Sequence, residues 1–379
     1  MILVVAPYSG DFPENTQFLA GSKKIRSVIK ILSRIDSDIV LLNTGHQIAE
    51  NRPQKVEVID FDGQCLIRVV TPATNKNPYL GRLFNIANAY SITEVVIGGF
   101  GVPDVAWFYN GYAFEMRVAR FLNKNFGTKT VIEFEDWHFA RNRGFNPKPY
   151  LDWLFWCMAI KHFDVGFAVN EFLAKILTRH NIPTTLLPSI VSPLISKISH
   201  CSPPFQSDLI TVGYFGGLCE EKGATALLNL AKTTNENVHF IITGSGDLES
   251  EFQALSKAQP ERFQFLGAVS EYRLANAISQ ADLIINAHHV NNGVFPFKVI
   301  EALASGRLLI STELPMHGYE DFSEAIQFYD GNEATLFNLV SDSFKIYQCK
   351  MAYIIKVAEK INAIYGEHSL VDVIRKQLR

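Results

Sequence analysis

Short apolar runs that alternate with helical patterns constrain the fold of this chain more than any other feature. In the first half, strands are predicted at Ile2–Ala6, Asp38–Leu42, Glu94–Gly98, Thr130–Phe134 and Asp164–Val169. Helical spacing of apolar residues is evident over Ser22–Ile35, and a further helix is predicted from Glu171 to Arg179. Such alternation predicts a parallel sheet covered by helices on both faces.

A stretch rich in proline and serine, from Leu187 to Phe205, interrupts the alternation and predicts a boundary between domains. After it, strands are predicted at Ile210–Phe215, Val238–Thr243, Phe263–Leu266, Leu283–Asn286 and Arg307–Thr312, with helices between them. We therefore predict an α/β protein with two doubly wound, Rossmann-like parallel-sheet domains that face each other across a cleft. The predicted boundaries are 1–190 for the first domain, 191–206 for the linker and 207–350 for the second domain, followed by a helical stretch at 351–379.

The composition restricts the class of protein. A chain of 379 residues, with 47% hydrophobic and 19% charged residues, can form two globular cores. The net charge of −3 argues against a nucleic-acid partner. Five cysteines without C-x-x-C spacing favour a reducing compartment. With no basic leader before the first apolar run and no window of roughly 18 apolar residues, a cytoplasmic protein is expected.

The segment from Phe295 to Gly306 joins an apolar loop to a helix with a carboxylate in its second turn. Pro296 suits the first helical turn, where a missing N–H costs little. Lys298 then lies beside the free amides of the helix, and Glu301 follows on the same side. A helix N-terminus with a lysine attracts phosphate, and a carboxylate one turn deeper can accept the hydroxyls of a ribose. This combination predicts a nucleoside diphosphate site.

Two strand-to-glycine turns in the second domain are further candidates for phosphate binding. In the first turn, Gly216 and Gly217 allow a ligand to approach the backbone, and Lys222 can reach a phosphate. The second turn, Ile241–Asp247, lacks the third glycine of a dinucleotide fingerprint. Taken alone, each also fits a tight turn between a strand and a helix.

Taken in order, these motifs resemble those of glycosyltransferases with the GT-B fold, specifically the large retaining family 4. A bacterial form of that family's loop-helix motif reads F-P-x-K-x-x-E-x-x-A-x-G, and this chain matches it at Phe295, Pro296, Lys298, Glu301, Ala304 and Gly306. The resemblance covers roughly residues 210–312. It departs from the family at Gly217, where an arginine would touch the donor diphosphate, and at Gly293, where the family has its first glutamate.

The resemblance implies a donor site in which Glu301 holds the ribose and the two lysines hold the diphosphate. It implies a nucleotide-sugar site at Gly10, Gly216, Gly217, Lys222, Gly244, Leu266, Phe297, Lys298 and Glu301. In this site, Gly244 would contribute backbone, the strand end at Leu266 would contact the base through backbone, and Gly10 would face donor and acceptor. A C-terminal helix that packs back onto the first domain is also implied.

Acidic residues end a predicted strand of the first domain, in the segment Val131–His138. Glu133 and Glu135 should point to one face of the strand, and Asp136 to the other face or into the loop. Carboxylates at such a strand end border the ligand crevice of open α/β sheets. Family 4 often has a His-Asp pair here, whose histidine chemistry this chain cannot share. We predict Glu135 and Asp136 as sugar or acceptor contacts, although solvated acids at a strand end are the plainer interpretation.

Two surfaces could dock on anionic lipid. The helix over Ser22–Ile35 carries five basic residues, and Tyr150–Trp156 mixes aromatic residues with nearby basic ones. The alternative is that one face of each helix packs on its sheet. The acid pairs Asp36/Asp38 and Asp60/Asp62 have the spacing that some glycosyltransferases use for a divalent ion, but they lie away from the phosphate motifs. We therefore predict metal-independent chemistry without a cofactor.

Together these features predict the transfer of a sugar, with retention, from a nucleoside diphosphate sugar to a hydroxyl of a glycan or lipid-linked glycan. Catalytic contributions are expected from Asp136, Glu135 and Lys222, in bacterial surface-polysaccharide synthesis in the cytoplasm or at the inner face of the membrane. Two alternatives stay open. One is a non-catalytic subunit that binds glycan or a partner protein, supported by Gly217 and Gly293; the other is a nucleotide-sugar epimerase or hydrolase.

Overall fold

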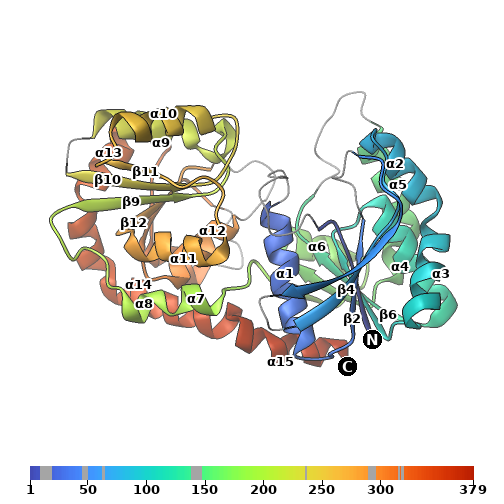
Figure 1. The fold of residues 1–379 in the computed structure, drawn as a ribbon. Helices are drawn as coiled ribbons and strands as arrows, with labels where there is room; N and C mark the ends of the chain where they lie inside the picture. Colours follow the sequence, from blue (N-terminus) through green and yellow to red (C-terminus); the bar gives the residue numbers. More distant parts are fainter. Residues whose placement is uncertain are drawn as a thin grey trace. The chain divides into compact units, whose positions relative to one another are not determined.

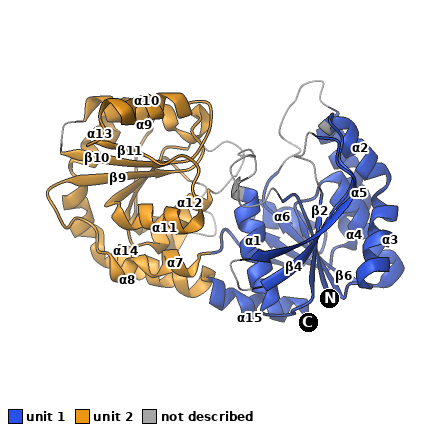
Figure 2. Ribbon diagram, in the orientation of Figure 1, with its two compact units in different colours: residues 1–190, 367–379 blue, residues 191–366 orange. Residues whose placement is uncertain are grey.

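The computed structural model describes residues 1–8, 19–44, 50–61, 65–137, 147–234, 237–288, 296–314, 316 and 320–379. They form two compact α/β units (Figure 2), unit 1 with residues 1–190 and 367–379, and unit 2 with residues 191–366. Residues 191–206 and 351–366 belong to unit 2, whereas the sequence predicts a linker in the former and a separate helical extension that includes the latter.

Unit 1 contains an eight-stranded sheet in the order β3-β4-β2-β1-β5-β6-β7-β8, in which only the β3–β4 pair is antiparallel. The strands are β1 (Ile2–Ala6), β2 (Ile39–Asn43), β3 (Lys55–Phe61), β4 (Cys65–Thr71), β5 (Val105–Tyr109), β6 (Lys129–Phe134), β7 (Val165–Ala168) and β8 (Thr184–Leu186). The strands β1, β2 and β5 are buried along their whole length, because helices cover both faces. The edge strand β3 is largely exposed.

The helices of unit 1 are α1 (Leu19–Ser33), α2 (Pro78–Ala87), α3 (Ala89–Phe100), α4 (Ala113–Phe126), α5 (Lys148–Ala159), α6 (Glu171–Arg179) and α15 (Glu367–Leu378), with the short η3 (Ile160–His162). Asparagine side chains cap two of them: Asn77 accepts from the first amides of α2, and Asn170 from Leu173 N in α6. The C-terminal helix α15 lies beside α1 (Figure 1), where Glu367 pairs with Arg34 at 2.7 Å.

The predicted strand at Glu94–Gly98 is wrong, because these residues belong to α3. The buried residues of α3 are Ala89, Thr93 and Val96, whose spacing of four and three residues is helical. A short apolar run fits a strand and a buried helix equally well. The strand of this part of the sheet is β5, which begins at Val105.

Unit 2 contains a fully parallel six-stranded sheet in the order β11-β10-β9-β12-β13-β14. The strands are β9 (Ile210–Phe215), β10 (Val238–Thr243), β11 (Phe263–Phe265), β12 (Leu283–Asn286), β13 (Leu308–Ser311) and β14 (Ile326–Phe328). Successive strands run outward from β9 in one direction and from β12 in the other. The chain therefore has a topological switch point between β9 and β12, where ligands of open parallel sheets bind.

The helices of unit 2 are α7 (Pro193–Ser196), α8 (Ile198–Cys201), α9 (Ala224–Thr233), α10 (Glu249–Ala258), α11 (Glu271–Gln280), α12 (Phe297–Ala304), α13 (Glu333–Ser341) and α14 (Ser343–Tyr365), with η4 (Glu220–Lys222) and η5 (Glu320–Ala325). The five strands predicted after the proline-rich stretch are present, and helices lie between them. Among the described helices of both units, none combines the length and apolarity needed to span a bilayer.

Candidate nucleotide-sugar site

Two glycine turns meet at the carboxyl end of the unit 2 sheet. The turn after β9 and the turn after β10 are held by hydrogen bonds from Gly216 N to Thr243 O (3.1 Å) and from Gly244 N to Gly267 O (2.8 Å). A Cβ atom on Gly244 would lie only 1.8 Å from Gly216 O, and the φ of Gly244 is +133°. Only glycine fits at this crossing, so the predicted Gly216 and Gly244 lie together at the switch point.

Lys222 lies in η4, directly after the first glycine turn. Its Nζ atom is 3.0 Å from His288 Nε2 and 3.4 Å from Glu221 Oε1. Burial, together with the charges of Lys222 and Lys298, lowers the pKa of His288 to about 4, so the imidazole is neutral at pH 7. A neutral imidazole can accept a hydrogen bond from Lys222 Nζ at Nε2, and in that tautomer its own proton is on Nδ1. Nδ1 is buried and has no hydrogen-bond partner within the described parts of the chain.

Lys298 lies in the first turn of α12 and points at the ring of Tyr214, with Nζ 4.6 Å from the ring centroid. Its Nζ atom is buried and has no hydrogen-bond partner among the residues that the structure describes. Burial, and secondarily the charge of Lys222, lowers the pKa of Lys298 to about 7. A Cβ atom on Gly216 would lie 3.7 Å from Lys298 Cδ, so the amine is next to the first glycine turn.

Tyr214 connects these groups. Its hydroxyl lies 2.9 Å from Gly217 O and 2.8 Å from Lys222 O, and its ring faces Lys298. The hydroxyl therefore fixes the loop between Gly217 and Lys222 in a single shape. Neither Tyr214 nor His288 was predicted to have this role, although both lie at the carboxyl ends of β9 and β12, the position that the switch point marks.

Glu301 lies one turn after Lys298 in α12, and its residue is 7% exposed. Phe297 begins the helix and is half-buried. Leu266 is half-buried and continues the pairing of β11 with β10, since its N–H donates to Ile242 O at 2.9 Å. Among the remaining candidates, Gly10 lies outside the described residues, as does the motif departure Gly293.

Gly217 occupies the position at which the family has an arginine. A Cβ atom there would meet nothing closer than Lys222 Cγ, at 3.5 Å. The backbone therefore leaves room for a side chain at this position. Among the described residues near the switch point, Lys222 and Lys298 are the basic side chains close enough to affect each other.

The acidic strand end of unit 1 has a different character, because its carboxylates are paired within the fold. Lys24 of α1 lies 3.1 Å from Glu135 Oε1 and 3.6 Å from Glu133 Oε1, and all three side chains are almost fully buried. Trp107 Nε1 donates to Glu133 Oε2 at 2.9 Å. Glu133 and Glu135 therefore share one face of β6, as the alternation of the strand predicts.

Burial, with a smaller contribution from the charge of Glu133, raises the pKa of Glu135 to about 8 against the opposing effect of Lys24. Asn110, with φ +60°, accepts hydrogen bonds at Oδ1 from the amides of Glu135 (2.9 Å) and Asp136 (3.1 Å). The Asp136 residue is half-buried at the end of this turn. Of the two predicted catalytic acids, Asp136 is therefore the more accessible, and Glu135 is a member of a buried ion pair.

The proposed basic docking face of α1 is not present. Lys24 is 4% exposed and Lys30 is 8% exposed, whereas Arg34 pairs with Glu367. The alternative interpretation, in which this helix packs on its sheet, is the one that the structure supports. The sequence missed Lys24 as the partner of Glu133 and Glu135 because the charge pattern of the helix was assigned to solvent.

No group of three or more potential metal ligands occurs among the described residues. Asp36 accepts a hydrogen bond from Asp38 N at 2.9 Å and pairs with the N-terminal ammonium group at 3.2 Å. Asp38 pairs with Arg68. The side chains of Asp36 and Asp38 therefore bind groups within unit 1, just before the start of β2.

Comparisons with known proteins bear on the fold and on the sequence of the second unit. Residues 210–339 match the family model described as "Glycosyl transferases group 1". No curated protein is significantly similar in sequence to this chain.

Solved structures with similar folds cover almost the whole chain. A sucrose-phosphate synthase from Thermosynechococcus elongatus has a TM-score of 0.69 and 13% identity over 99% of this chain and 98% of that one. An α,α-trehalose 6-phosphate synthase from Burkholderia multivorans has a TM-score of 0.66 and 12% identity over 100% and 98%. The Anabaena protein HepE in complex with UDP has a TM-score of 0.64 and 13% identity over 100% and 99%. The chain therefore has the two-domain GT-B fold, and the residues that match the glycosyl transferases group 1 model lie in its second unit.

Proposed function

We propose that this protein transfers a sugar from a nucleoside diphosphate sugar to a hydroxyl of a glycan or lipid-linked glycan. The observation that carries the proposal is the Lys298 amine, buried without a hydrogen-bond partner in the described part of the chain, beside a glycine turn and a second lysine. Lys298 has no carboxylate partner among the described residues, and the only carboxylate that Lys222 contacts there is the exposed Glu221, so the two amines would suit a ligand with two negative charges or more.

The chemistry follows from where charge develops. During transfer, the bond between the anomeric carbon and the diphosphate oxygen breaks, and the electron pair stays on the diphosphate. Lys222, Lys298 and the N-terminal amides of α12 would stabilise that charge. The bond to the acceptor oxygen then forms at the anomeric carbon, and the departing phosphate accepts the acceptor's proton. This scheme needs no separate strong base and no metal ion.

The donor side of the proposal rests on α12 and the sheet edge. Glu301 would accept the ribose hydroxyls, and backbone at Leu266 and Gly244 would contact the base and the phosphates. The similar HepE structures include complexes with UDP, with UDP and glucose, and with UDP-glucose. They support a nucleotide sugar as the donor of this chain as well.

For the acceptor side, we propose Asp136 as the contact with the sugar or acceptor and Gly10 as a neighbour of both substrates. Glu135 would help to position Asp136, because the backbone amides of both residues donate to Asn110 Oδ1. Retention of anomeric configuration, a role in surface-polysaccharide synthesis and a location in the cytoplasm or at the inner face of the membrane complete the proposal. Retention rests on the resemblance to family 4, the polysaccharide role on the bacterial form of its motif at Phe295–Gly306, and the location on cysteines without C-x-x-C spacing.

A donor screen by thermal shift tests the proposal. Wild type, Lys222→Ala and Glu301→Ala would each be heated with nucleoside diphosphate sugars, with and without EDTA. A bound donor stabilises the folded state by about 2.7 kcal/mol at a hundredfold excess over Kd. We expect one donor to stabilise wild type and neither variant, with no effect of EDTA.

Turnover separates the proposal from its rivals. The donor found in the screen would be incubated with oligosaccharide and lipid-linked acceptors, and with none. Product that requires an acceptor supports the transferase. Donor consumption without acceptor would favour a hydrolase or epimerase, and binding without any turnover would favour a non-catalytic subunit, which Gly217 in place of an arginine already suggests.

A further inference from the structure

Two neighbouring helices of unit 1 expose an unusual amount of apolar surface. The exposed large apolar residues of α2 and α5 are Tyr79, Leu80, Leu83, Phe84, Tyr150, Trp153, Leu154 and Met158. Trp153 is 55% exposed and Tyr150 is 66% exposed. The opposite side of α5 is buried, since Asp152 is 1% exposed and Trp156 is 3% exposed and stacks on Phe134. The exposed residues are therefore not the ones that attach the helix to its sheet.

An ion pair joins the two helices. Arg82 of α2 donates through Nη2 to both carboxylate oxygens of Asp152 in α5, at 3.0 and 3.2 Å. The same carboxylate accepts from Ala113 N at the start of α4 (2.9 Å). The helices α2 and α5 lie next to each other at one edge of unit 1 (Figure 1). We call the eight exposed residues and the helices that carry them the α2–α5 face.

Basic residues outnumber acidic ones around this face, where the exposed Glu94 of α3 is an acidic neighbour. The helices α2, α4 and α5, with η3, contain two carboxylates, Glu115 and Asp152, and both are buried. The basic residues on the same elements are Arg82, Arg117, Arg120, Lys124, Lys148 and Lys161. The chain as a whole has a net charge of −3, so these helices differ in sign from the rest of the molecule. An anionic partner fits such a surface.

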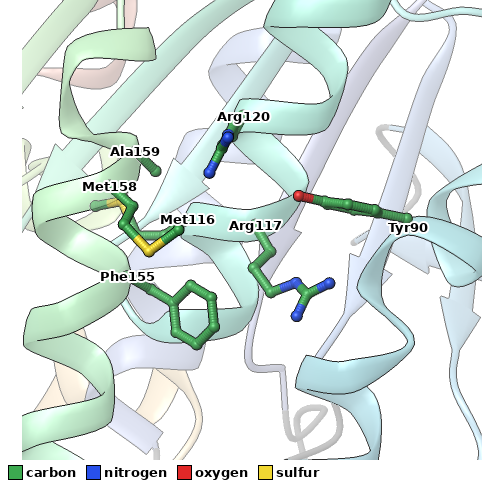
Figure 3. A pocket seen from close by; sticks show the side chains of 7 residues that line it. All are labelled: Tyr90, Met116, Arg117, Arg120, Phe155, Met158 and Ala159. Carbon is green, nitrogen blue, oxygen red and sulfur yellow. The ribbon is translucent and has the colours of Figure 1, made fainter.

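A cavity of about 170 Å³ opens beside the α2–α5 face (Figure 3). It is lined by Tyr90, Met116, Arg117, Arg120, Phe155, Met158 and Ala159. The Arg117 guanidinium lies between two rings, 4.7 Å from the centroid of Tyr90 and 5.5 Å from that of Phe155. Met158 belongs to the cavity and to the exposed face. The cavity thus combines a fixed cation with apolar walls, which suits a group that is anionic at one end and apolar at the other.

We propose that the α2–α5 face docks on a membrane that contains anionic phospholipid, with Trp153, Tyr150 and Leu83 in the interface region. Aromatic residues favour the interface between headgroups and acyl chains, and basic residues are attracted to the negative leaflet. The Arg117 cavity receives a lipid phosphate with the start of its acyl chain. The proposal deepens the proposed function, because docking would bring the protein to a lipid-linked acceptor.

Vesicle binding tests this proposal with the full chain. Wild type would be sedimented with vesicles of phosphatidylcholine alone and of phosphatidylcholine mixed with phosphatidylglycerol, at low and high salt. We expect binding to the mixed vesicles only, weakened by salt. The variant Leu83→Ser/Trp153→Ser should lose about tenfold or more in partition, and Arg117→Gln/Arg120→Gln should lose the preference for phosphatidylglycerol. Tyr272→Ser, at a site in unit 2 that is 72% exposed, is the matched control and should bind as wild type.

The outcomes separate this proposal from the proposed function. Stabilisation by a nucleotide sugar would be measured on the same preparations, and Leu83→Ser/Trp153→Ser should retain it, which also shows that the variant is folded. If wild type ignores anionic vesicles, or if the variant binds them equally well, the docking proposal is wrong whatever the donor result. A dimer in sedimentation velocity that Leu83→Ser/Trp153→Ser abolishes would also overturn it, because the face would then serve a second copy of the chain.

Discussion

Lys24 in unit 1 and Lys298 in unit 2 both place their amines away from solvent, but in opposite surroundings. Lys24 lies between the carboxylates of Glu133 and Glu135 and donates to Leu187 O at 3.1 Å. Lys298 faces the Tyr214 ring, with the Lys222 charge nearby. The first cluster neutralises itself and stabilises the fold, whereas the second leaves positive charge for an anion. We therefore propose Lys298, whose amine has no carboxylate partner among the described residues, as the lysine that binds a ligand, and Lys24 as a structural lysine.

The largest expected effect is the loss of Lys24. Lys24→Met leaves two buried carboxyl groups without their cation, and we expect the free energy of unfolding to fall by about 3–5 kcal/mol at pH 7. Without the lysine, the pKa values of both carboxyl groups rise further, and a raised pKa stabilises the folded state at low pH only. The destabilisation should therefore be smaller at pH 5 than at pH 7 in urea titrations.

Lys175→Met is the matched control for Lys24. Lys175 is 56% exposed and pairs with Glu171 at 3.4 Å along the surface of α6, so its removal should cost about 0.5 kcal/mol or less. Equal effects of the two substitutions would contradict the view that the Lys24 cluster stabilises unit 1.

The next effect concerns the glycine crossing in unit 2. Gly244→Ala would put a Cβ atom 1.8 Å from Gly216 O on a backbone with φ +133°, and we expect a loss of about 1–3 kcal/mol with loss of donor binding. Gly98→Ala, in helix α3 of unit 1, introduces the same methyl group where nothing lies within 4 Å, and should leave donor binding and stability close to wild type. Urea titration and the donor thermal shift check both variants. Donor binding by Gly244→Ala would show that the crossing does not form the phosphate site.

Lys298→Met tests whether the buried lysine of unit 2 destabilises the folded state at pH 7. The pKa of Lys298 in the folded state is about 7, below its ordinary value of 10.5, so the unfolded chain binds more protons between those values. This lysine should therefore stabilise wild type progressively more as the pH rises from about 7 toward 10.5, so the stability of wild type relative to Lys298→Met should increase over that range. At pH 7 we expect Lys298→Met to unfold at the same or a higher temperature than wild type. A clear destabilisation at pH 7 would assign the lysine to the fold.

The same lysine should couple donor binding to a proton. A bound diphosphate favours the ammonium form, so at pH 8 binding should take up close to one proton per molecule. Titration calorimetry in buffers of different ionisation enthalpy measures this number. Lys298→Met should bind without proton uptake and more weakly by about tenfold to hundredfold.

Glu115 gives the smallest effect and sharpens the comparison, because it is a buried acid without a lysine. Both of its carboxylate oxygens are buried and lack a hydrogen-bond partner within the described residues, and burial raises its pKa to about 8. A raised pKa means that stability is present below about 4.5 and is lost as the pH rises through 8. Glu115→Gln should therefore raise Tm at pH 9 by about 2 °C or more and leave it nearly unchanged at pH 5. Glu94→Gln, at an exposed position on α3, serves as the control. A Tm difference between Glu115→Gln and wild type that is the same at pH 5 and pH 9 would contradict the prediction.

The sequence predicted unit 2 well because each strand there is a short apolar run that ends at a polar or glycine-containing turn. The helix after Pro296 and the strand before Gly216 follow from local rules, so Lys222, Lys298 and Glu301 could be proposed from the sequence. Lys222 and Lys298 come close together because β9 and β12, the strands before them, are neighbours in the sheet. Tyr214 and His288 were missed as partners, because nothing local distinguishes a strand tyrosine that faces a lysine from one in the core.

Unit 1 was harder to predict, because its features depend on contacts that are distant in sequence. Lys24 contacts Glu133 and Glu135 only after α1 packs on the sheet. From the sequence alone, this lysine was one of five basic residues of a possible lipid-docking surface. The run Glu94–Gly98 was assigned to a strand because its apolar length fits one, and tertiary packing made it part of α3. The exposed half of α5 was recognised, but the ion pair between Arg82 and Asp152 that joins it to α2 requires the fold.

The central claim is tested most directly by donor binding in two variants measured side by side. The preferred nucleoside diphosphate would be titrated into Lys298→Met and into Lys24→Met/Glu135→Gln, where the glutamine removes one buried carboxylate and limits the loss of stability. We expect the unit 1 variant to bind within about threefold of wild type and Lys298→Met to bind at least about tenfold more weakly. Unchanged affinity in Lys298→Met, with binding lost in the folded unit 1 variant, would contradict the assignment of the two lysines.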